Sequence, residues 1–373
     1  MRHLRGILPG AARQLTLDNQ IFRLQPFGGI STYWRELEAG LEANAIRFDV
    51  VHSKPIVRIQ PVYAPGSVFH SSYYRCALGR DSRTVTTVHD LIPERGLATS
   101  GGRALFIRYR RTLLRMSDAF ICVSEQTKND LLSMYPNECI HKPVYVAEHG
   151  NPRTSFIGRE KPLPQPSPIE ARERIFLFIG NRDGYKSFSV AIDAFALSGL
   201  AGEGYVLLCS GATFAPHEQA LLRKLRLTNS VRWTGRLETR QLYQLYAGAL
   251  ALVYPSSYEG FGLPIVEAMT FGCIPLVANV DPMRSVVGDL MPTFSPGDAH
   301  ALAKLMVEVV SPSRAKDISA RACTRANHFR WSRSIGQHIA LYRELGADVS
   351  PLEEGMHADS RSADASAPPE LQI

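Results

Sequence analysis

The chain has few cysteines, and they follow no pattern of a metal site or a disulfide framework. Among its 373 residues six are cysteine, and no Cys-x-x-Cys pair or zinc-ligand spacing occurs. The six are Cys76, Cys122, Cys139, Cys209, Cys273 and Cys323. Several of them lie in apolar runs typical of strands, so we predict buried free thiols in a reducing compartment.

Long apolar runs are missing as well. No stretch approaches the ~20 consecutive apolar residues that a membrane-spanning helix needs, and the opening segment MRHLRGILPGAA lacks the apolar centre of a signal peptide. We therefore expect a soluble, cytoplasmic protein in which residues 1–12 are flexible. The tail over 349–373 is rich in Ser, Ala, Asp, Glu and Pro, which predicts disorder there.

The sequence does contain enough apolar material for two cores. Hydrophobic residues make up 45% of the chain, and its 373 residues exceed what one ordinary core holds. The formal net charge is +7, which indicates an acidic partner such as a nucleotide diphosphate, an anionic membrane face or nucleic acid. No zinc, RRM or helix-turn-helix pattern supports nucleic acid, so we expect none.

Apolar strands alternate with amphipathic helices along two stretches of the chain, and this alternation predicts two doubly wound parallel sheets of the α/β class. Between the stretches lies REKPLPQPS, a polar and proline-rich segment typical of a linker. We predict a first domain over 1–158, a linker over 159–170, a second domain over 171–330, and a C-terminal helix over 331–348.

The segment YPSSYEGFGLPIVEAM carries the strongest functional signal. It follows ALALVYPS, a short apolar run that predicts a buried strand, and Pro264 suits the first turn of a helix. The turn between strand and helix would open at the carboxyl edge of the sheet and place Glu259 in the crevice. Free N–H groups at the helix start favour a phosphate, and Glu267 lies about one turn further along. A diphosphate that carries sugars suits this combination.

This segment resembles the signature of retaining glycosyltransferases of the GT-B fold, in which two glutamates separated by seven residues surround a Gly-Phe-Gly-Leu-Pro turn. The resemblance covers most of the chain, from about Leu15 to Leu345, and implies two facing domains with a last helix that crosses back. It also implies roles: Glu259 lies near the donor sugar and Glu267 holds the nucleotide ribose. The backbone at the three residues Phe261, Gly262 and Leu263 faces the sugar and diphosphate.

Two other interpretations of the segment stay open. One is a dinucleotide-binding fingerprint, although Ile265 stands where its third glycine is needed and the turn falls late in the chain. The other is a buried helix with one solvated glutamate and one loop glutamate. Both explain less of the segment than the resemblance does.

A transferase that cleaves a sugar from a diphosphate must stabilise the charge of the leaving phosphate with a metal or with fixed cations. The sequence contains no Asp-x-Asp pair, so we expect no metal and no cofactor beyond the donor itself. The strand IFLFIG runs into NRDGYKS, which places Arg182 and Lys186 at the same sheet edge as Glu259. The turn looks like the family's diphosphate-binding turn, and we assign both cations to the donor phosphates. A solvated basic turn is the alternative.

Two further segments predict site residues in the first domain. In VTTVHDLIPE, His89 follows an apolar strand, and the family shows a similar His-Asp at that place; we assign it near the anomeric carbon. Gly28 and Gly29 precede an amphipathic helix, where small residues let a diphosphate or an acceptor approach the backbone. The Gly-Gly-Ile-Ser turn resembles that of bacterial polysaccharide-assembly members of the family.

The helix predicted over Arg103 to Arg115 mixes arginines with Phe, Ile, Tyr and Leu. A basic amphipathic helix of this kind can contact anionic lipid at the inner face of a membrane, as a polyprenyl-linked acceptor would require. A helix that faces the core and carries a charged outer face is the alternative.

We therefore expect a metal-independent, retaining hexosyltransferase of cell-surface polysaccharide synthesis, such as O-antigen or lipopolysaccharide assembly. Its partners would be a nucleotide sugar, with GDP-mannose first, and a saccharide or lipid-linked saccharide acceptor. The prediction that mannose is the transferred sugar rests on the resemblance to the polysaccharide-assembly subgroup. Two alternatives remain: a nucleotide-sugar epimerase of the same fold, or a basic binding protein without enzymatic activity.

Overall fold

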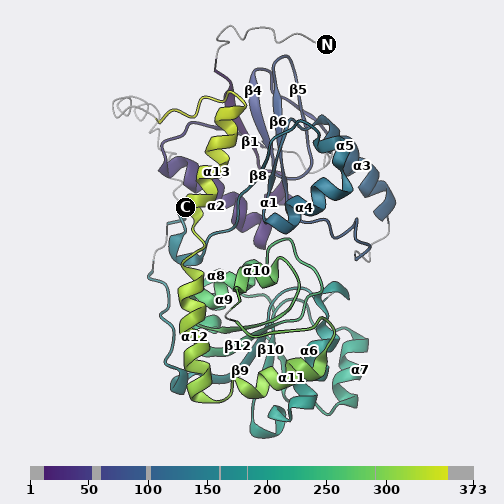
Figure 1. Cartoon of the computed structure of the whole chain (residues 1–373), viewed down its shortest axis with the longest axis vertical. Helices are drawn as coiled ribbons and strands as arrows, with labels where there is room; N and C mark the ends of the chain where they lie inside the picture. The colour runs from purple at the N-terminus through teal and green to yellow at the C-terminus, as the bar shows by residue number, and fades with distance from the viewer. Residues whose placement is uncertain are drawn as a thin grey trace, which may run out of the picture.

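A computed structural model describes residues 12–52, 60–97, 102–158, 161–182, 184–289 and 291–351. It consists of two halves, one above the other, each built on a six-stranded sheet whose strands are all parallel (Figure 1). Two parallel α/β domains were predicted from the alternation of strands and helices, and this fold class is confirmed. Arg159 and Glu160 of the predicted linker lie outside the described residues, as does most of the tail.

The first sheet has the strand order β2-β1-β4-β6-β7-β8. Its strands are β1 (Gln14–Asp18), β2 (Asp49–Val51), β4 (Ser67–Ser71), β6 (Arg83–Val88), β7 (Ala119–Cys122) and β8 (Val144–Val146), and β3 (Val62–Tyr63) pairs separately with β5 (Ala77–Leu78). Strands β4 and β7 are buried along their whole length, because helices cover both faces. The strand order reverses between β1 and β4, so the loops after these strands diverge and leave a crevice.

The second sheet has the order β11-β10-β9-β12-β13-β14. Its strands are β9 (Glu173–Phe178), β10 (Val206–Cys209), β11 (Val231–Trp233), β12 (Ala249–Tyr254), β13 (Ile274–Ala278) and β14 (Thr293–Phe294). This is the strand order of a nucleotide-binding doubly wound fold, and it reverses between β9 and β12. The loop after β9 carries Lys186 and the loop after β12 carries Glu259, so both predicted residues lie at the reversal point.

Helices connect and cover the strands of both sheets. Those of the first half are α1 (Ile21–Leu24), α2 (Gly29–Ala43), α3 (Arg103–Met116), α4 (Glu125–Met134) and α5 (Pro136–Cys139). The rest are α6 (Phe188–Ser198), α7 (Pro216–Lys224), α8 (Thr239–Gly248), α9 (Leu263–Thr270), α10 (Met283–Val287), α11 (Ala299–Glu308), α12 (Pro312–Ala326) and α13 (Trp331–Glu344). None of the helices described is long and apolar enough to cross a membrane.

Local sequence signals fix where several of these helices begin and end. Ser124 caps α4 by accepting a hydrogen bond from the Thr127 amide at 3.0 Å, and Asp298 caps α11 in the same way. Pro216 occupies the first turn of α7, where its missing N–H costs nothing. Gly199 ends α6 in the left-handed conformation, with φ at 72°.

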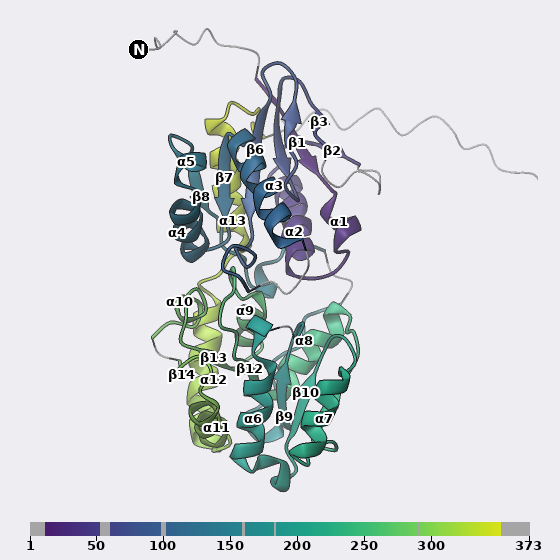
Figure 2. The ribbon, with the colours of Figure 1, turned by 90° about the vertical axis from the view of Figure 1, so that its right-hand side faces the viewer.

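The last helix ties the two halves together. Helix α12 packs against α9 and β13 of the second half, whereas α13 packs against α2 and β8 of the first half. Both views show α12 and α13 running along one side of the molecule, from the lower half into the upper (Figures 1 and 2). Gly150 allows the close approach of this crossing, because a Cβ there would overlap the backbone and ring of Trp331.

A continuous apolar core extends through both halves. Trp34 of α2, Phe261 of the signature turn and Trp331 of α13 are all buried in the same cluster. All six cysteines are free thiols, as predicted, and every one except the half-buried Cys323 is fully buried. The two halves thus share one apolar core.

Candidate active site

A cavity of about 490 Å³ lies between the halves, at the carboxyl ends of β6, β9 and β12. Most of the residues predicted for the site line it together, and they come from loops on both halves. These are Gly28, Gly29, His89, Lys186, Glu259, Phe261, Gly262 and Leu263. Residues separated by more than 230 positions in the chain therefore line one cavity.

Lys186 and Glu259 form a buried ion pair in this cavity. Lys186 Nζ lies 2.5 Å from Glu259 Oε1 and 3.3 Å from the Tyr254 hydroxyl. The two charged side chains are only 13% and 10% exposed, so water screens their interaction weakly. Each charge offsets the cost of burying the other. A ligand with a phosphate and several hydroxyls can take over both roles, the phosphate at Lys186 and a hydroxyl at Glu259.

The start of α9 forms the opposite wall. Gly262, Leu263 and Pro264 line the cavity at the helix N-terminus, where free N–H groups and the helix dipole favour an anion. Gly262 has φ of 97°, a left-handed conformation in which a side chain would be strained, and a Cβ there would lie 2.9 Å from Ile265. The glycine therefore sets the direction of the helix start relative to the cavity.

His89 contributes a neutral imidazole from the end of β6. Burial, together with the nearby His149, lowers the pKa of His89 to about 3, so the ring is uncharged near neutral pH. Among the described residues its Nε2 has no hydrogen-bond partner, although it is fully buried. The edge of the ring packs against Tyr33 with 5.1 Å between ring centroids. A buried ring nitrogen without a partner at a cavity wall is suited to a ligand hydroxyl.

The signature turn is bound directly to the first half. The Gly260 carbonyl accepts hydrogen bonds from the Ser124 and Thr127 hydroxyls, at 2.6 and 3.0 Å. Two residues earlier, the Tyr258 hydroxyl donates to Asp130 at 2.8 Å. A Cβ on Gly260 would overlap the carbonyl oxygen of His89, so only glycine permits this contact. The turn thus carries Glu259 on one side and the contact between the halves on the other.

Similarity to known proteins covers both halves. Residues 160–324 match the family described as Glycosyl transferases group 1, and residues 62–150 match Glycosyltransferase Family 4. The chain is a group 1 glycosyltransferase of the GT-B fold.

Relatives of this glycosyltransferase include two from Escherichia coli. The O-antigen chain mannosyltransferase B is 33% identical over 175 residues, which cover 45% of this chain and 45% of that protein. The serotype-specific mannosyltransferase WbdA is 23% identical over 82% of this chain and 38% of its own length. The matches thus span less than half of either relative. Among solved structures, the sucrose-phosphate synthase of Thermosynechococcus elongatus has a TM-score of 0.66 at 17% identity, covering 89% of this chain and 99% of that one.

Arg182 lies apart from the other predicted phosphate ligands in the glycosyltransferase. Its guanidinium pairs with Glu218 at 2.8 Å and donates to the carbonyls of Ala212 and Thr213, each at 2.7 Å. The group also lies 5.4 and 5.0 Å from the ring centroids of Phe188 and Phe214. After β9 the chain turns toward α7 at Arg182 and back toward β12 at Lys186, so the two cations face different cavities. Of the two, Lys186 lines the main cavity and Arg182 does not. The assignment of Arg182 to the donor phosphates stays a prediction.

Glu267 is likewise absent from the described residues that line the main cavity. It lies on α9, where its carboxylate accepts a hydrogen bond from the Tyr246 hydroxyl at 3.3 Å. Burial raises the pKa of Glu267 to about 7, because no cation compensates the charge. Its assignment to the ribose stays a prediction.

The sequence analysis missed a second histidine in the cavity. His149 follows β8 as His89 follows β6, so a polar residue after an apolar strand was the available signal. Its ring stacks on Phe261 with centroids 4.8 Å apart, and among the described residues neither ring nitrogen has a partner. Asn181 and Tyr185, which also line the cavity, lie within the basic turn GNRDGYKSF.

The arginines of α3 largely face inward or pair with acids. Arg110 is buried and pairs with Glu94 at 2.9 Å, while Arg111 and Arg115 lie 3.7 and 3.1 Å from Glu138. Arg110 thus faces the core, while Arg103 and Arg108 are exposed on the outer face of the helix. Contact of this face with a membrane stays a prediction.

Proposed function

We propose that this glycosyltransferase is a retaining hexosyltransferase that moves mannose from GDP-mannose to a saccharide acceptor in cell-surface polysaccharide synthesis. One observation carries the proposal: Lys186, Glu259, His89 and the start of α9 surround a single cavity at the reversal point of the second sheet. The Escherichia coli relatives, both mannosyltransferases, support mannose as the sugar.

In the proposed reaction the diphosphate lies against Lys186 and the N–H groups of α9, and the hexose lies between Glu259 and His89. The acceptor hydroxyl oxygen forms a bond to the anomeric carbon while the bond from that carbon to the diphosphate oxygen breaks. Attack from the face that the diphosphate leaves preserves the anomeric configuration. The hydroxyl proton passes to the departing phosphate oxygen, so the products are a glycoside and the nucleoside diphosphate.

We further propose that fixed cationic and dipolar groups, rather than a metal, stabilise the leaving diphosphate. Lys186 supplies a full charge, and α9 supplies preorganised N–H donors at the wall of the cavity. Transfer should therefore continue in excess EDTA. A full loss of transfer with EDTA, restored by magnesium or manganese, would contradict this part of the proposal.

A panel of nucleotide sugars tests the donor. The protein would be incubated with GDP-mannose, UDP-glucose, UDP-N-acetylglucosamine and GDP-fucose, with and without mannosides as acceptors. Release of GDP together with a new α-glycoside supports the proposal, and proton NMR of the anomeric signal reports retention. Conversion of the donor sugar without a glycoside would indicate an epimerase, and a β-linked product would indicate inversion.

We propose that the acceptor is lipid-linked and that α3 touches the membrane surface beside it. Arg103 and Arg108 are exposed on this helix, whereas Arg110 is buried. Sedimentation with vesicles of 30% phosphatidylglycerol, a composition chosen to be anionic, should retain the wild type and release a variant with Arg103→Glu and Arg108→Glu. Equal binding of both proteins would remove α3 from the proposal.

A further inference from the structure

A second cavity, of about 470 Å³, lies beside the main cavity and shares the residue His149 with it. Its walls come from α4 and β8 of the first half, from the start of α13, and from residues 328–330, which follow α12. Because α12 packs on the second half and α13 on the first, this cavity lies where the chain crosses between the halves. We name it the crossing cavity.

Helix α13 presents a basic and polar face to the crossing cavity. The lining residues of this helix are spaced three, four and seven positions from the first, as on one face of a helix, and they are Arg330, Arg333, Ser334 and Gln337. The helix begins without a side-chain cap, so the positive end of its dipole adds to the two guanidinium charges. Within the part of the chain that the structure describes, neither arginine forms an ion pair.

Two buried polar side chains in the wall of the crossing cavity lack hydrogen-bond partners. Ser334 is 1% exposed and His149 is 5% exposed. Among the described residues, neither the Ser334 hydroxyl nor either ring nitrogen of His149 has a partner. Burial lowers the pKa of His149 to about 3, so the ring is neutral near pH 7 and carries one N–H. Since buried polar groups are normally paired, these two indicate a polar ligand.

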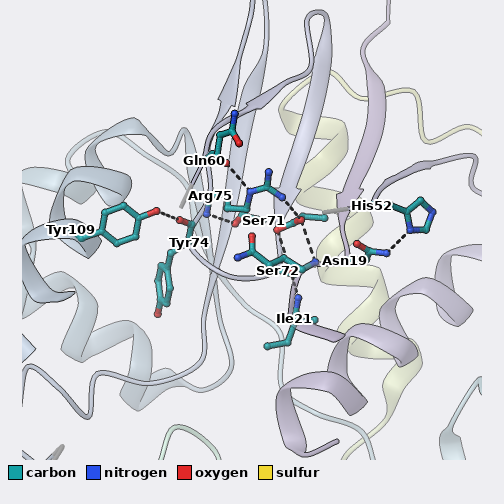
Figure 3. A network of polar contacts seen from close by, with 11 residues as sticks. Asn19, Ile21, His52, Gln60, Ser71, Ser72, Tyr74, Arg75 and Tyr109 are labelled. Carbon is teal, nitrogen blue, oxygen red and sulfur yellow. Dashed lines mark hydrogen bonds and ion pairs between the residues drawn. The ribbon is translucent and has the colours of Figure 1, made fainter. Parts of the chain in front are cut away.

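A buried polar network elsewhere in the first half shows the usual arrangement of such groups. In the turn after β4, the Ser72 hydroxyl donates to Asp18 at 3.1 Å and accepts from the Ile21 amide at 3.1 Å (Figure 3). Arg75 pairs with the same carboxylate at 3.0 Å. Ser334 is as deeply buried as Ser72, at 1% exposed, yet its hydroxyl has no such partner among the described residues.

Two carboxylates also line the crossing cavity, and the basic side chains outweigh them. Glu125 lies 4.0 Å from Lys128, so these two charges offset one another. Burial raises the pKa of Glu148, which disfavours its ionised form, although the charges of His328 and Arg333 act in the opposite direction. An excess of positive charge therefore remains at the start of α13.

From this geometry we propose that the crossing cavity binds a small molecule that carries a phosphate group, at a site separate from that of the donor diphosphate. The phosphate would lie against Arg330, Arg333 and the start of α13. It would accept hydrogen bonds from the Ser334 hydroxyl and the His149 ring. Because His149 stacks on Phe261, with 4.8 Å between centroids, the ligand would contact a residue that supports the signature turn. This inference depends neither on the donor nor on glycosyl transfer.

Binding of inorganic phosphate, measured by titration calorimetry, is the first test. Lys186→Ala protein serves as the background, since this substitution weakens anion binding in the main cavity. In this background Arg333→Ala should weaken phosphate binding about tenfold or more, and Arg333→Lys should retain most of it because the charge remains. Arg343→Ala removes the same charge from an exposed position in the last turn of α13 and is the matched control.

Ser334→Ala separates a role in ligand binding from a role in the fold. Because the hydroxyl has no partner among the described residues, its removal should leave Tm unchanged or slightly higher. The same substitution should weaken phosphate binding about three- to tenfold, the effect of one lost hydrogen bond. A lower Tm with unchanged phosphate affinity would show that the hydroxyl serves the fold, and would overturn its assignment.

Glycerol 3-phosphate distinguishes two sources of the phosphate group. If it binds more tightly than inorganic phosphate and loses affinity in Arg333→Ala, the site takes a phosphate monoester; equal affinities, both lowered in Arg333→Ala, indicate the free ion.

The proposal would be overturned by phosphate binding that Arg333→Ala leaves unchanged or that Arg343→Ala weakens equally. Absence of binding at about 20 mM phosphate would also overturn it, since a specific site should have a Kd of about 1 mM or lower. Thermal unfolding of each variant shows whether it is folded.

Discussion

At the scale of single residues, the role of each charged side chain near the main cavity depends on the residue with which it forms an ion pair. Lys186 and Glu259 neutralise one another, so neither is free until a ligand separates them. Arg182 has the same charge as Lys186 and lies four positions earlier, yet it is paired with Glu218 in another cavity. We therefore expect substitutions of Lys186 and of Arg182 to have different effects.

Lys186→Ala should raise the donor KM at least tenfold, because it removes the cation at the diphosphate and leaves Glu259 unpaired. Arg182→Ala should instead lower the free energy of unfolding by about 3 kcal/mol, since it leaves Glu218 buried without its partner, and should change the donor KM little. Steady-state kinetics of both variants measure the donor KM, and urea unfolding measures the free energy of unfolding. A rise in donor KM for Arg182→Ala equal to that of Lys186→Ala would return Arg182 to the phosphate site.

Glu267 should make stability depend on pH. Its pKa is about 7 in the folded protein, raised from a value of 4.5, so the folded state holds a proton that the unfolded state has lost. Stability should thus fall as pH rises from about 4.5 to 7 and stay low above that range. The Glu267→Gln substitution removes the free-energy cost of ionising a buried carboxyl, because glutamine stays uncharged at every pH.

A comparison of Tm between the wild type and Glu267→Gln tests whether stability falls as pH rises. At pH 8.5 the variant should melt about 2–4 °C higher, and at pH 5 the two should be close. If Glu267 holds the ribose, the same variant also binds the nucleoside diphosphate more weakly by titration calorimetry. Unchanged nucleotide affinity would argue against that role.

At the level of elements, α4 joins the donor loop to the first half. Its cap residue Ser124 and its first-turn residue Thr127 both donate to the Gly260 carbonyl, and Asp130 one turn later accepts from Tyr258. Arg95 strengthens this contact, because it pairs with Asp130 at 2.6 Å and lies 4.6 Å from the Tyr258 ring. One face of α4 therefore positions the turn that carries Glu259.

Thr127→Val should lower kcat/KM for the donor by about two- to tenfold, the effect of losing one hydrogen bond, with little change in Tm. Valine keeps the shape of threonine, and the amide at this position still reaches the Ser124 cap. Kinetics and thermal unfolding measure both quantities. Thr112→Val on α3, which breaks a bond within one exposed helix, is the control. An unchanged kcat/KM would show that this bond does not position the loop.

At the level of the whole molecule, the candidate active site lies where the halves meet. Gly28, Gly29 and His89 come from the first half, and Lys186 and Glu259 come from the second. The contact between Gly260 and the His89 carbonyl leaves no room for a side chain. A side chain at this position would therefore keep the halves from approaching as closely as they do.

Gly260→Ala should keep the halves apart and abolish transfer while each half stays folded. Its φ lies outside the left-handed range, so alanine adds the overlap with His89 without backbone strain. Small-angle scattering with saturating GDP-mannose should give a smaller radius of gyration for the wild type than for the variant.

The control for this experiment is Gly202→Ala, since a Cβ at Gly202 meets nothing within 4 Å. This variant should have the radius of gyration and the transfer activity of the wild type. Closure around the donor would be refuted if the wild type gave the same radius of gyration with and without the donor. Full transfer activity in Gly260→Ala would show that the contact is dispensable.

The sequence by itself determined the two sheets and most of the residues that line the main cavity. Strands and helices follow from local periodicity, and residues after apolar strands in parallel sheets must gather at one edge. His89, Lys186, Glu259 and the turn at Gly262 could therefore be named from the sequence. The direction of the Arg182 side chain could not be predicted from the sequence. Arg182 and Lys186 are two cations in one turn, and only the packing of Arg182 against α7 distinguishes them.

Only the tertiary structure decided what the two halves build between them. The hydrogen bonds from α4 to Gly260, the stacking of His149 on Phe261 and the packing of Tyr74 against Phe106 join residues distant in the chain. No local pattern encodes such contacts, because they depend on how two separately formed sheets pack across a shared apolar core. Most residues of the main cavity could thus be named from the sequence, whereas the contact that joins the halves follows from packing.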